Sequence, residues 1–157
     1  MAVEIERKFL LKNDEWRHAV IDSARMEQAY LGGTHCSVRV RISGAQAWLN
    51  IKRRVLGMQR SEYEYPIPVE DARAMIEELA DGPVIAKTRH YVQVHGRRWE
   101  IDEFHGENAP LVVAEIELAH VDEVIDPPLW LGLEVTDQRR YYNSELAHTP
   151  FSKWAQP

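Results

Sequence analysis

The chain has 157 residues, of which 45% are apolar and 28% charged, so it can bury a core and is not intrinsically disordered. No apolar run approaches the ~18 residues of a membrane helix, and the N-terminus alternates charges where a secretory signal would be apolar. The single cysteine, Cys36, excludes a disulfide framework and a cysteine-rich zinc site. We therefore expect a cytoplasmic protein in which residues 1–157 form one domain.

The net charge of −6 is unevenly distributed along the chain. Residues 1–60 carry 11 Lys/Arg and 6 Asp/Glu, whereas residues 61–157 carry 8 and 19. The acidic total argues against nonspecific binding to nucleic acid or to an anionic membrane. It leaves room for a local cationic pocket that binds a small polyanion.

Strict alternation of apolar and polar residues is the dominant local pattern, and it predicts strands. The predicted strands are 3–10, 37–42, 47–55, 61–67, 85–95, 98–104, 111–119 and 132–136. Helices are predicted at 14–24 and 70–80, with a third between Arg139 and Pro150, and turns at 44–46, 95–96 and 106–110. Many strands and few helices favour a mainly β protein built on an antiparallel sheet that can close into a barrel.

Like charges occupy the same face of several predicted strands. Side chains at i and i+2 of a strand point the same way, so Arg39 and Arg41 share a face, as do Glu62 and Glu64. The same holds for Glu4 with Glu6 and Lys8, Asn50 with Lys52 and Arg54, Lys87 with Arg89, Glu100 with Asp102, and Glu115 with Glu117.

A sheet whose charged face meets water is the simplest interpretation of this alternation. Solvated faces usually mix signs, however, and like charges about 6.6–6.8 Å apart repel each other. One shared cavity that holds cations and carboxylates explains the pattern better. Arginine and lysine would bind phosphate oxygens there, and clustered carboxylates would hold Mg²⁺ or Mn²⁺, which prefer oxygen ligands.

The N-terminal Glu-Ile-Glu-Arg-Lys-Phe resembles the ExExK signature of the CYTH superfamily, the triphosphate tunnel metalloenzymes. Further motifs follow in the family's order: Gln-Ala-Tyr-Leu at 28–31, Val-Arg-Val-Arg at 38–41, Ile-Lys-Arg at 51–53, Glu-Tyr-Glu at 62–64, Lys-Thr-Arg at 87–89, Glu-Ile-Asp at 100–102, Ala-Glu-Ile-Glu-Leu at 114–118 and Glu-Val-Thr at 134–136. The resemblance covers almost the whole chain and is closest to the short bacterial members. It implies a closed eight-stranded antiparallel barrel with a hydrophilic tunnel and a few flanking helices.

The resemblance also implies roles for individual residues. Glu4, Glu6 and Glu117 resemble ligands of the principal metal, and Tyr30 with Lys52 resembles a tyrosine–lysine unit that accepts a proton. A second ion, or an oriented water, would be held by Glu62, Glu64, Asp102 and Glu115. The triphosphate would be bound by Lys8, Arg39, Arg41, Lys52, Arg54, Lys87 and Arg89. Asn50 departs from the pattern, since threonine or another small polar residue is expected there.

The activity that the resemblance implies is hydrolysis of inorganic triphosphate to diphosphate and phosphate with Mg²⁺, or alternatively Mn²⁺. The expected partner is the small-molecule substrate, with neither nucleic acid nor membrane, and the chain would act as a monomer or homodimer. Relatives also include class IV adenylate cyclases and thiamine triphosphatases, so both stay open as alternatives. A noncatalytic polyphosphate- or nucleotide-binding module is a further alternative, although a pure anion binder has no electrostatic reason to keep carboxylates at 4, 6, 115 and 117. A structural barrel with solvated charges is the remaining one.

Overall fold

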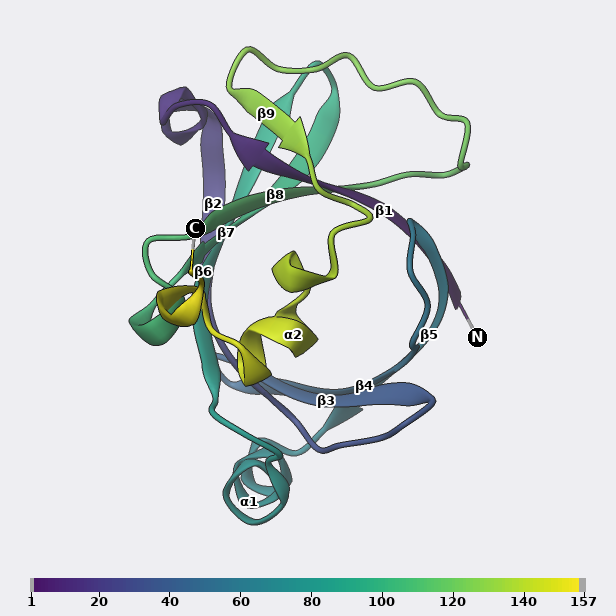
Figure 1. The fold of residues 1–157 in the computed structure, drawn as a ribbon, viewed down its shortest axis with the longest axis vertical. Coiled ribbons are helices and arrows are strands. Elements are labelled where there is room, and N and C mark those ends of the chain that lie inside the picture. The colour runs from purple at the N-terminus through teal and green to yellow at the C-terminus, as the bar shows by residue number, and fades with distance from the viewer. Residues whose placement is uncertain (1, 156–157) are drawn as a thin grey trace.

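The computed structural model describes residues 2–155 and shows a closed β-barrel seen end-on in Figure 1. The strands are β1 (Ala2–Leu11), β2 (Val20–Tyr30), β3 (Cys36–Ser43), β4 (Gln46–Arg53), β5 (Gln59–Ile67), β6 (Ile85–Val94), β7 (Arg97–Phe104), β8 (Val112–Glu117) and β9 (Leu131–Glu134). The ring runs β5-β4-β3-β2-β6-β7-β8-β1, every pairing is antiparallel, and β1 pairs with β5 to close it. The expected eight-stranded antiparallel barrel is therefore confirmed.

Many apolar side chains of the barrel strands point outward, and short helices and β9 cover a large part of them. On one side Phe9, Trp99 and Ile116 pack with Trp16 of η1 (Glu15–Ala19) and with Trp130, next to β9. On another side α1 (Val69–Leu79) covers β3 and β4. Because the outer face is apolar and covered, the alternating polar positions are left to face the barrel interior.

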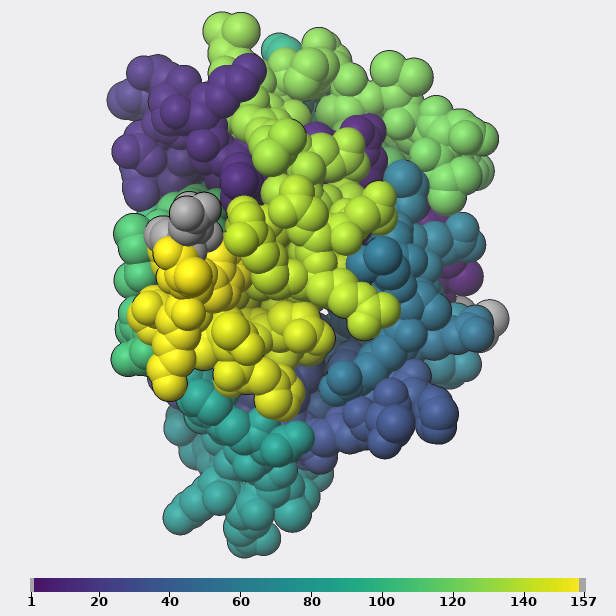
Figure 2. All heavy atoms as spheres, in the orientation of Figure 1, coloured from purple at the N-terminus to yellow at the C-terminus, as the bar shows by residue number. Residues whose placement is uncertain are grey.

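The C-terminal part of the chain closes one end of the barrel. Helix α2 (Asn143–His148) and η3 (Arg139–Tyr141) lie within the ring in Figure 1, and Figure 2 shows this segment covering the barrel end that faces the viewer. Leu146 is 1% exposed and belongs to an apolar cluster with Ile85, Phe104 and Val113. The segment continues into η4 (Phe151–Lys153), whose Phe151 packs against the same cluster. This end of the barrel is therefore apolar, in contrast to the middle.

The prediction of a helix at 14–24 was wrong beyond residue 19. Only Glu15–Ala19 is helical, as a single 3-10 segment, and β2 begins at Val20. From Val20 to Gln28 this strand pairs with β6, so its backbone groups are satisfied by the sheet and not by a helix. The predicted helix 70–80 corresponds to α1, and η3 with α2 form the helical segment expected between Arg139 and Pro150.

The predicted strand 132–136 forms as β9 but is not part of the ring. β9 pairs only with the end of β1, with Phe9 opposite Glu134 and Leu11 opposite Leu131. The sequence predicted eight strands that included 132–136 but not β2. In the structure, β2 is in the ring and β9 is not. The predicted turn at 95–96 is confirmed, since His95 and Gly96 both have positive φ angles, 51° and 71°, as a tight hairpin turn requires. Within residues 2–155, no helix has the length and apolar character that crossing a membrane demands.

We expect Leu146→Ala to destabilise the protein by about 2–5 kcal/mol, because it removes a buried side chain from the apolar end of the barrel. Leu129→Ala is the matched control, since Leu129 is 92% exposed and should change stability by no more than ~0.5 kcal/mol. The free energy of unfolding from denaturant titration checks both. Equal effects of the two substitutions would contradict the packing of α2 described here.

Candidate active site

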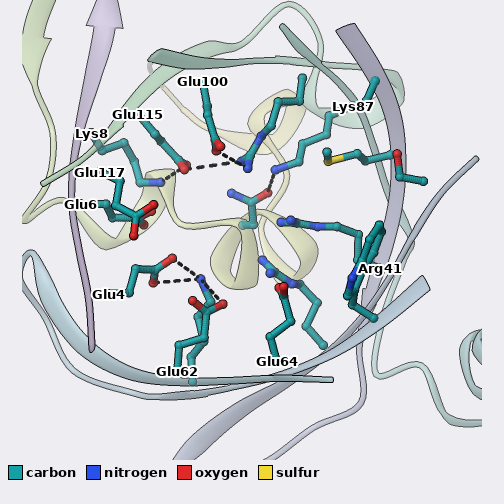
Figure 3. Close-up of a pocket in the computed structure, with 18 of the residues that line it drawn as sticks. Glu4, Glu6, Lys8, Arg41, Glu62, Glu64, Lys87, Glu100, Glu115 and Glu117 are labelled. Carbon is teal, nitrogen blue, oxygen red and sulfur yellow. Dashed lines mark hydrogen bonds and ion pairs between the residues drawn. The ribbon is translucent and has the colours of Figure 1, made fainter. Parts of the chain in front are cut away.

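The barrel encloses a cavity of about 820 Å³ lined mainly by charged side chains. In Figure 3 the labelled Glu4, Glu6 and Glu117 lie on one side of the cavity, with Lys8 beside them, and Arg41 and Lys87 lie on the opposite side. The first group comes from β1 and β8, the second from β3 and β6. The alternation of the sequence therefore places both signs in one chamber.

Three glutamates form the acidic wall. Glu6 lies directly opposite Glu117 across the β1–β8 pairing. Burial raises the pKa of Glu6, and the neighbouring Glu115 raises it further. Burial also raises the pKa of Glu117, with Glu4 and Glu100 adding to the effect. Glu6 keeps a raised pKa although Arg60 Nη2 lies 2.9 Å from its Oε1, and within residues 2–155 Glu117 has no ion-pair partner that offsets the repulsion.

Glu4 differs from its two neighbours because two cations hold it. Lys52 Nζ lies 2.9 Å from Glu4 Oε1, and Arg60 Nε lies 2.9 Å from Glu4 Oε2. Burial alone would raise the pKa of Glu4, but these two cations outweigh it and bring the value down to about 2. Lys52 also lies 3.4 Å from Glu62. Asn50 Nδ2 donates hydrogen bonds to both Glu62 and Glu64.

The cationic wall contains two arginines that lack carboxylate partners, the buried Arg39 and the half-buried Arg41. Arg39 is 8% exposed, and its Nε has no hydrogen-bond partner. Arg41 donates only to Gln28, at 3.1 Å, and within residues 2–155 neither arginine takes part in an ion pair. Burial lowers the pKa of Arg41 to about 10, with Arg39 and Arg89 contributing, so positive charge accumulates here.

Lys87 and Arg89 are held in place by a buried carboxylate behind the cavity. Asp102 Oδ2 lies 2.6 Å from Lys87 Nζ, and Arg89 donates two hydrogen bonds of 2.8 Å to the Asp102 carboxylate. Burial would raise the pKa of Asp102, but Arg89 and Lys87 overcome this and lower it. Burial lowers the pKa of Lys87 to about 7. Asp102 raises this pKa, but the cations Arg89 and Arg41 lower it and so oppose the effect of Asp102.

Glu115 joins the two walls. It forms ion pairs with Lys8 and, at 3.5 Å, with Arg89. Burial would raise the pKa of Glu115, but Lys8 and Arg89 lower it well below the usual value. Glu115 is therefore an ionised bridge inside the barrel, and Figure 3 shows both of its contacts as dashed lines.

Most of the residues predicted from the sequence line this cavity, with two exceptions. Arg54 follows the last residue of β4, is exposed, and donates its Nε to the Cys36 carbonyl outside the cavity. The alternation predicted a strand to residue 55, and the strand ends two residues earlier. Asp102 is fully buried and supports Lys87 and Arg89 without lining the cavity itself. Tyr30 and Lys52 both line it, with Lys52 bonded to Glu4.

Three residues of the site were missed by the sequence analysis. Arg60 of β5 points inward opposite Glu4, and it shares the parity of Glu62, so an earlier start of the predicted strand would have found it. Gln28 is the first residue of the Gln-Ala-Tyr-Leu motif, but the motif predicted no role for it. Asn143 of α2 accepts hydrogen bonds of 2.9 Å from both Gln28 and Lys87, a contact that no local pattern signals.

The chemistry of the acidic wall fits a divalent cation. Carboxylate oxygens are the ligands preferred by Mg²⁺ and Mn²⁺, and the raised pKa values of Glu6 and Glu117 show negative charge that a cation would neutralise. In residues 2–155 no three acidic, histidine or cysteine side chains are already grouped in a metal-binding arrangement. Glu4 and Glu6 are instead engaged by Lys52 and Arg60.

A closed barrel with an ionic interior, apolar outside and charged within, is thus the class of structure that this chain forms. The sequence model of the CYTH domain matches residues 2–150, and the chain belongs to this family. It is 41% identical over 155 residues to an inorganic triphosphatase of Acetivibrio thermocellus, covering 98% of this chain and 99% of the relative. An inorganic triphosphatase of Nitrosomonas europaea is 34% identical over 151 residues, covering 92% and 96%. The crystal structure of the inorganic triphosphatase NE1496 superimposes with a TM-score of 0.68 at 31% identity, covering 94% and 95% of the two chains.

We expect Glu4→Gln and Glu117→Gln to change stability in opposite directions in the presence of a chelator. Glu4 has a lowered pKa, so its charge stabilises the fold at neutral pH, and this contribution is lost as the pH falls below about 4.5 toward 2. Glu4→Gln should therefore cost roughly 1.5–3 kcal/mol at pH 7, the value of hydrogen bonds to a charged group. Glu117 has a raised pKa, so Glu117→Gln relieves repulsion and should raise the melting temperature.

Thermal unfolding of both variants at neutral and acidic pH measures this pair of effects. As the pH falls, Glu117→Gln should converge on the wild type first, because Glu117 has a raised pKa, and Glu4→Gln only as the pH approaches 2. A loss of stability in both at neutral pH would mean that Glu117 is stabilised by its surroundings, contrary to the electrostatics described here.

Proposed function

We propose that this protein hydrolyses inorganic triphosphate to diphosphate and phosphate with the help of a divalent cation. The observation that carries the proposal is the distribution of charge in the cavity. Arg39 and Arg41 on one wall have no carboxylate partner, and on the other wall burial and neighbouring carboxylates raise the pKa values of Glu6 and Glu117. A polyanion and a cation bound side by side would compensate both walls at once. Relatives named inorganic triphosphatase, similar over nearly their whole length, support this choice of substrate.

The cationic wall would bind and orient the phosphates. Arg39 and Arg41 offer guanidinium groups that no carboxylate occupies, so their donors are available to phosphate oxygens. Lys87 and Arg89 are fixed by Asp102, so little conformational entropy would be lost when they contact the substrate. Phosphoryl transfer depends mainly on such positioning and on charge stabilisation, and no nucleophilic side chain is needed.

The acidic wall would hold the divalent cation through Glu4, Glu6 and Glu117, with Glu62, Glu64 or Glu115 as further oxygen ligands. We propose Mg²⁺ as the ion, with Mn²⁺ as the alternative. When bound, it would neutralise phosphate charge and help to position the attacking water. Asp102 is assigned a supporting role, since it holds two phosphate-binding cations from behind.

Lys52 is the residue we assign to proton handling near the water. Burial lowers the pKa of Lys52, and Arg39 lowers it further, which brings a lysine closer to the range where it can exchange a proton. Its ammonium group is oriented by Glu4 and Glu62. Tyr30, which lines the same cavity, is proposed as its partner.

The proposal is tested with inorganic triphosphate, ATP and thiamine triphosphate, each assayed with Mg²⁺, with Mn²⁺ and with chelator. We expect phosphate release from inorganic triphosphate, abolished by chelator. Formation of cyclic AMP and diphosphate from ATP would identify an adenylate cyclase. A preference for thiamine triphosphate would identify a thiamine triphosphatase. Tight binding of triphosphate without turnover under any condition would identify a noncatalytic binding module and refute the proposal.

We expect Arg39→Gln to raise the KM for triphosphate about ten-fold or more while leaving stability nearly unchanged. A charge-assisted hydrogen bond is worth roughly 1.5–3 kcal/mol, and no partner carboxylate is left unpaired by the change. Arg89→Gln is the contrasting variant, since it strips Asp102 of two hydrogen bonds and should cost about 3–5 kcal/mol of stability. Steady-state kinetics and denaturant unfolding separate the two. An unchanged KM in Arg39→Gln would remove this residue from the substrate site.

The charge on Lys87 predicts a pH dependence. With a pKa near 7, Lys87 is protonated below that pH and loses its charge above it, so its contribution to binding a polyanion is present at low pH and lost as the pH rises. The ratio of wild-type kcat/KM to that of Lys87→Met should be greatest below pH 7 and fall progressively above it, because kcat/KM reports the free enzyme. Comparing the two proteins cancels the titration of the substrate itself. A ratio that stays constant over this range would show that Lys87 does not titrate there.

A further inference from the structure

Arg60 occupies the position where the acidic wall is most crowded. Its Nε lies 2.9 Å from Glu4 Oε2 and its Nη2 lies 2.9 Å from Glu6 Oε1, so one guanidinium bridges two carboxylates that are two residues apart on the same face of β1. Burial lowers the pKa of Arg60, but Glu6 and Glu4 outweigh that effect and raise it. The position follows from the barrel closure, since Arg60 is the register partner of Glu4 in the β1–β5 pairing.

No other cation of the described chain plays this part. Lys52 contacts Glu4 but also lies 3.4 Å from Glu62, so it keeps a carboxylate partner if Glu4 is taken away. Within residues 2–155, the ion pairs of Arg60 are limited to Glu4 and Glu6. Arg60 is therefore committed to the same two carboxylates that we propose as metal ligands, and it holds their oxygens with directed donors.

We propose that Arg60 is a displaceable counter-ion that competes with the divalent cation for Glu4 and Glu6 and thereby sets the metal affinity of the site. This inference rests on the proposed metal-holding role of the acidic wall. A carboxylate oxygen that accepts a directed hydrogen bond from a guanidinium is less available to a cation, and two positive charges on the same pair of carboxylates repel each other. Metal entry therefore requires Arg60 to withdraw.

Two measurable consequences follow from this competition. Removal of the Arg60 charge should increase the affinity for a divalent ion, because nothing has to be displaced. It should also make the fold dependent on the metal, because Arg60 compensates the buried carboxylates when no metal is present. The wild type, in contrast, should lose little thermal stability on chelation.

The experiment is a titration of chelator-stripped protein with Mn²⁺, following the free-ion signal by electron paramagnetic resonance without any triphosphate. We expect Arg60→Gln to bind Mn²⁺ about ten-fold or more tightly than the wild type, a difference of ~1.4 kcal/mol. Melting temperatures measured with and without Mn²⁺ should show a larger metal-induced rise in Arg60→Gln than in the wild type.

Arg41→Gln is the matched control, because it removes the same charge from the same cavity without touching Glu4 or Glu6. Its Mn²⁺ affinity should stay within about three-fold of the wild type, since only a long-range interaction is lost. An equal gain in both variants would show that net charge alone sets the affinity and would overturn the proposal. Unchanged or weaker binding by Arg60→Gln would also overturn it.

Arg60→Lys covers the case in which Arg60→Gln does not fold without metal. A lysine keeps the charge but has no planar fork to bridge two carboxylates, so Mn²⁺ should bind more tightly than in the wild type, though less so than without the charge. Affinity equal to the wild type in this variant would contradict the competition. The Mn²⁺ titration contains no substrate, so it is independent of the triphosphate assay. If Mn²⁺ binds as expected but none of the three triphosphates is hydrolysed, only the proposed function is refuted. Hydrolysis with unchanged Mn²⁺ affinity would refute only this inference.

Discussion

Compensation of charge inside a closed barrel is the constraint on which the rest of this structure depends. The ring of eight strands has no free edge, so its backbone groups are satisfied without regard to which face is polar. Ionic side chains can then point inward, provided that each finds an opposite charge or a ligand, because an isolated buried charge costs far more than the fold can supply. The apolar outer face in turn needs the cover that η1, α1 and β9 provide.

The charges inside the barrel fall into two groups with different roles. Asp102 and Glu115 are buried with the cations that they contact, and these cations lower the pKa values of both carboxylates, so that both stay ionised inside the wall. Arg39 is buried without a partner, and Glu6 and Glu117 repel their neighbours. The first group orients the wall, and the second leaves the unbalanced charge that ligands would compensate. Arg60 stands between them, since its ion pairs are made with the groups proposed to bind metal.

Helix α2 connects the closed end of the barrel with the cationic wall. Its Leu146 packs among apolar side chains, while Asn143, three residues earlier, accepts hydrogen bonds from Gln28 and Lys87. Gln28 in turn accepts a hydrogen bond from Arg41. The chain after β9 therefore does more than cover the barrel: it orients two of the cations proposed to bind phosphate.

The sequence alone determined which faces of the strands are polar, because side chains of a strand alternate strictly and a charged pair at i and i+2 must share a face. Glu4, Glu6, Arg39, Arg41, Lys87 and Glu115 could all be assigned to one interior in this way, and the motifs indicated the family. Tertiary structure decided what depends on pairing and on strand ends. Pairing with β6 made residues 20–24 a strand where local spacing predicted a helix, and β2 instead of β9 completed the ring. The end of β4 at Arg53 kept Arg54 out of the cavity, and the register of β1 with β5 brought Arg60 onto Glu4. Such outcomes are set by contacts between segments distant in the chain, which no local pattern of residues encodes.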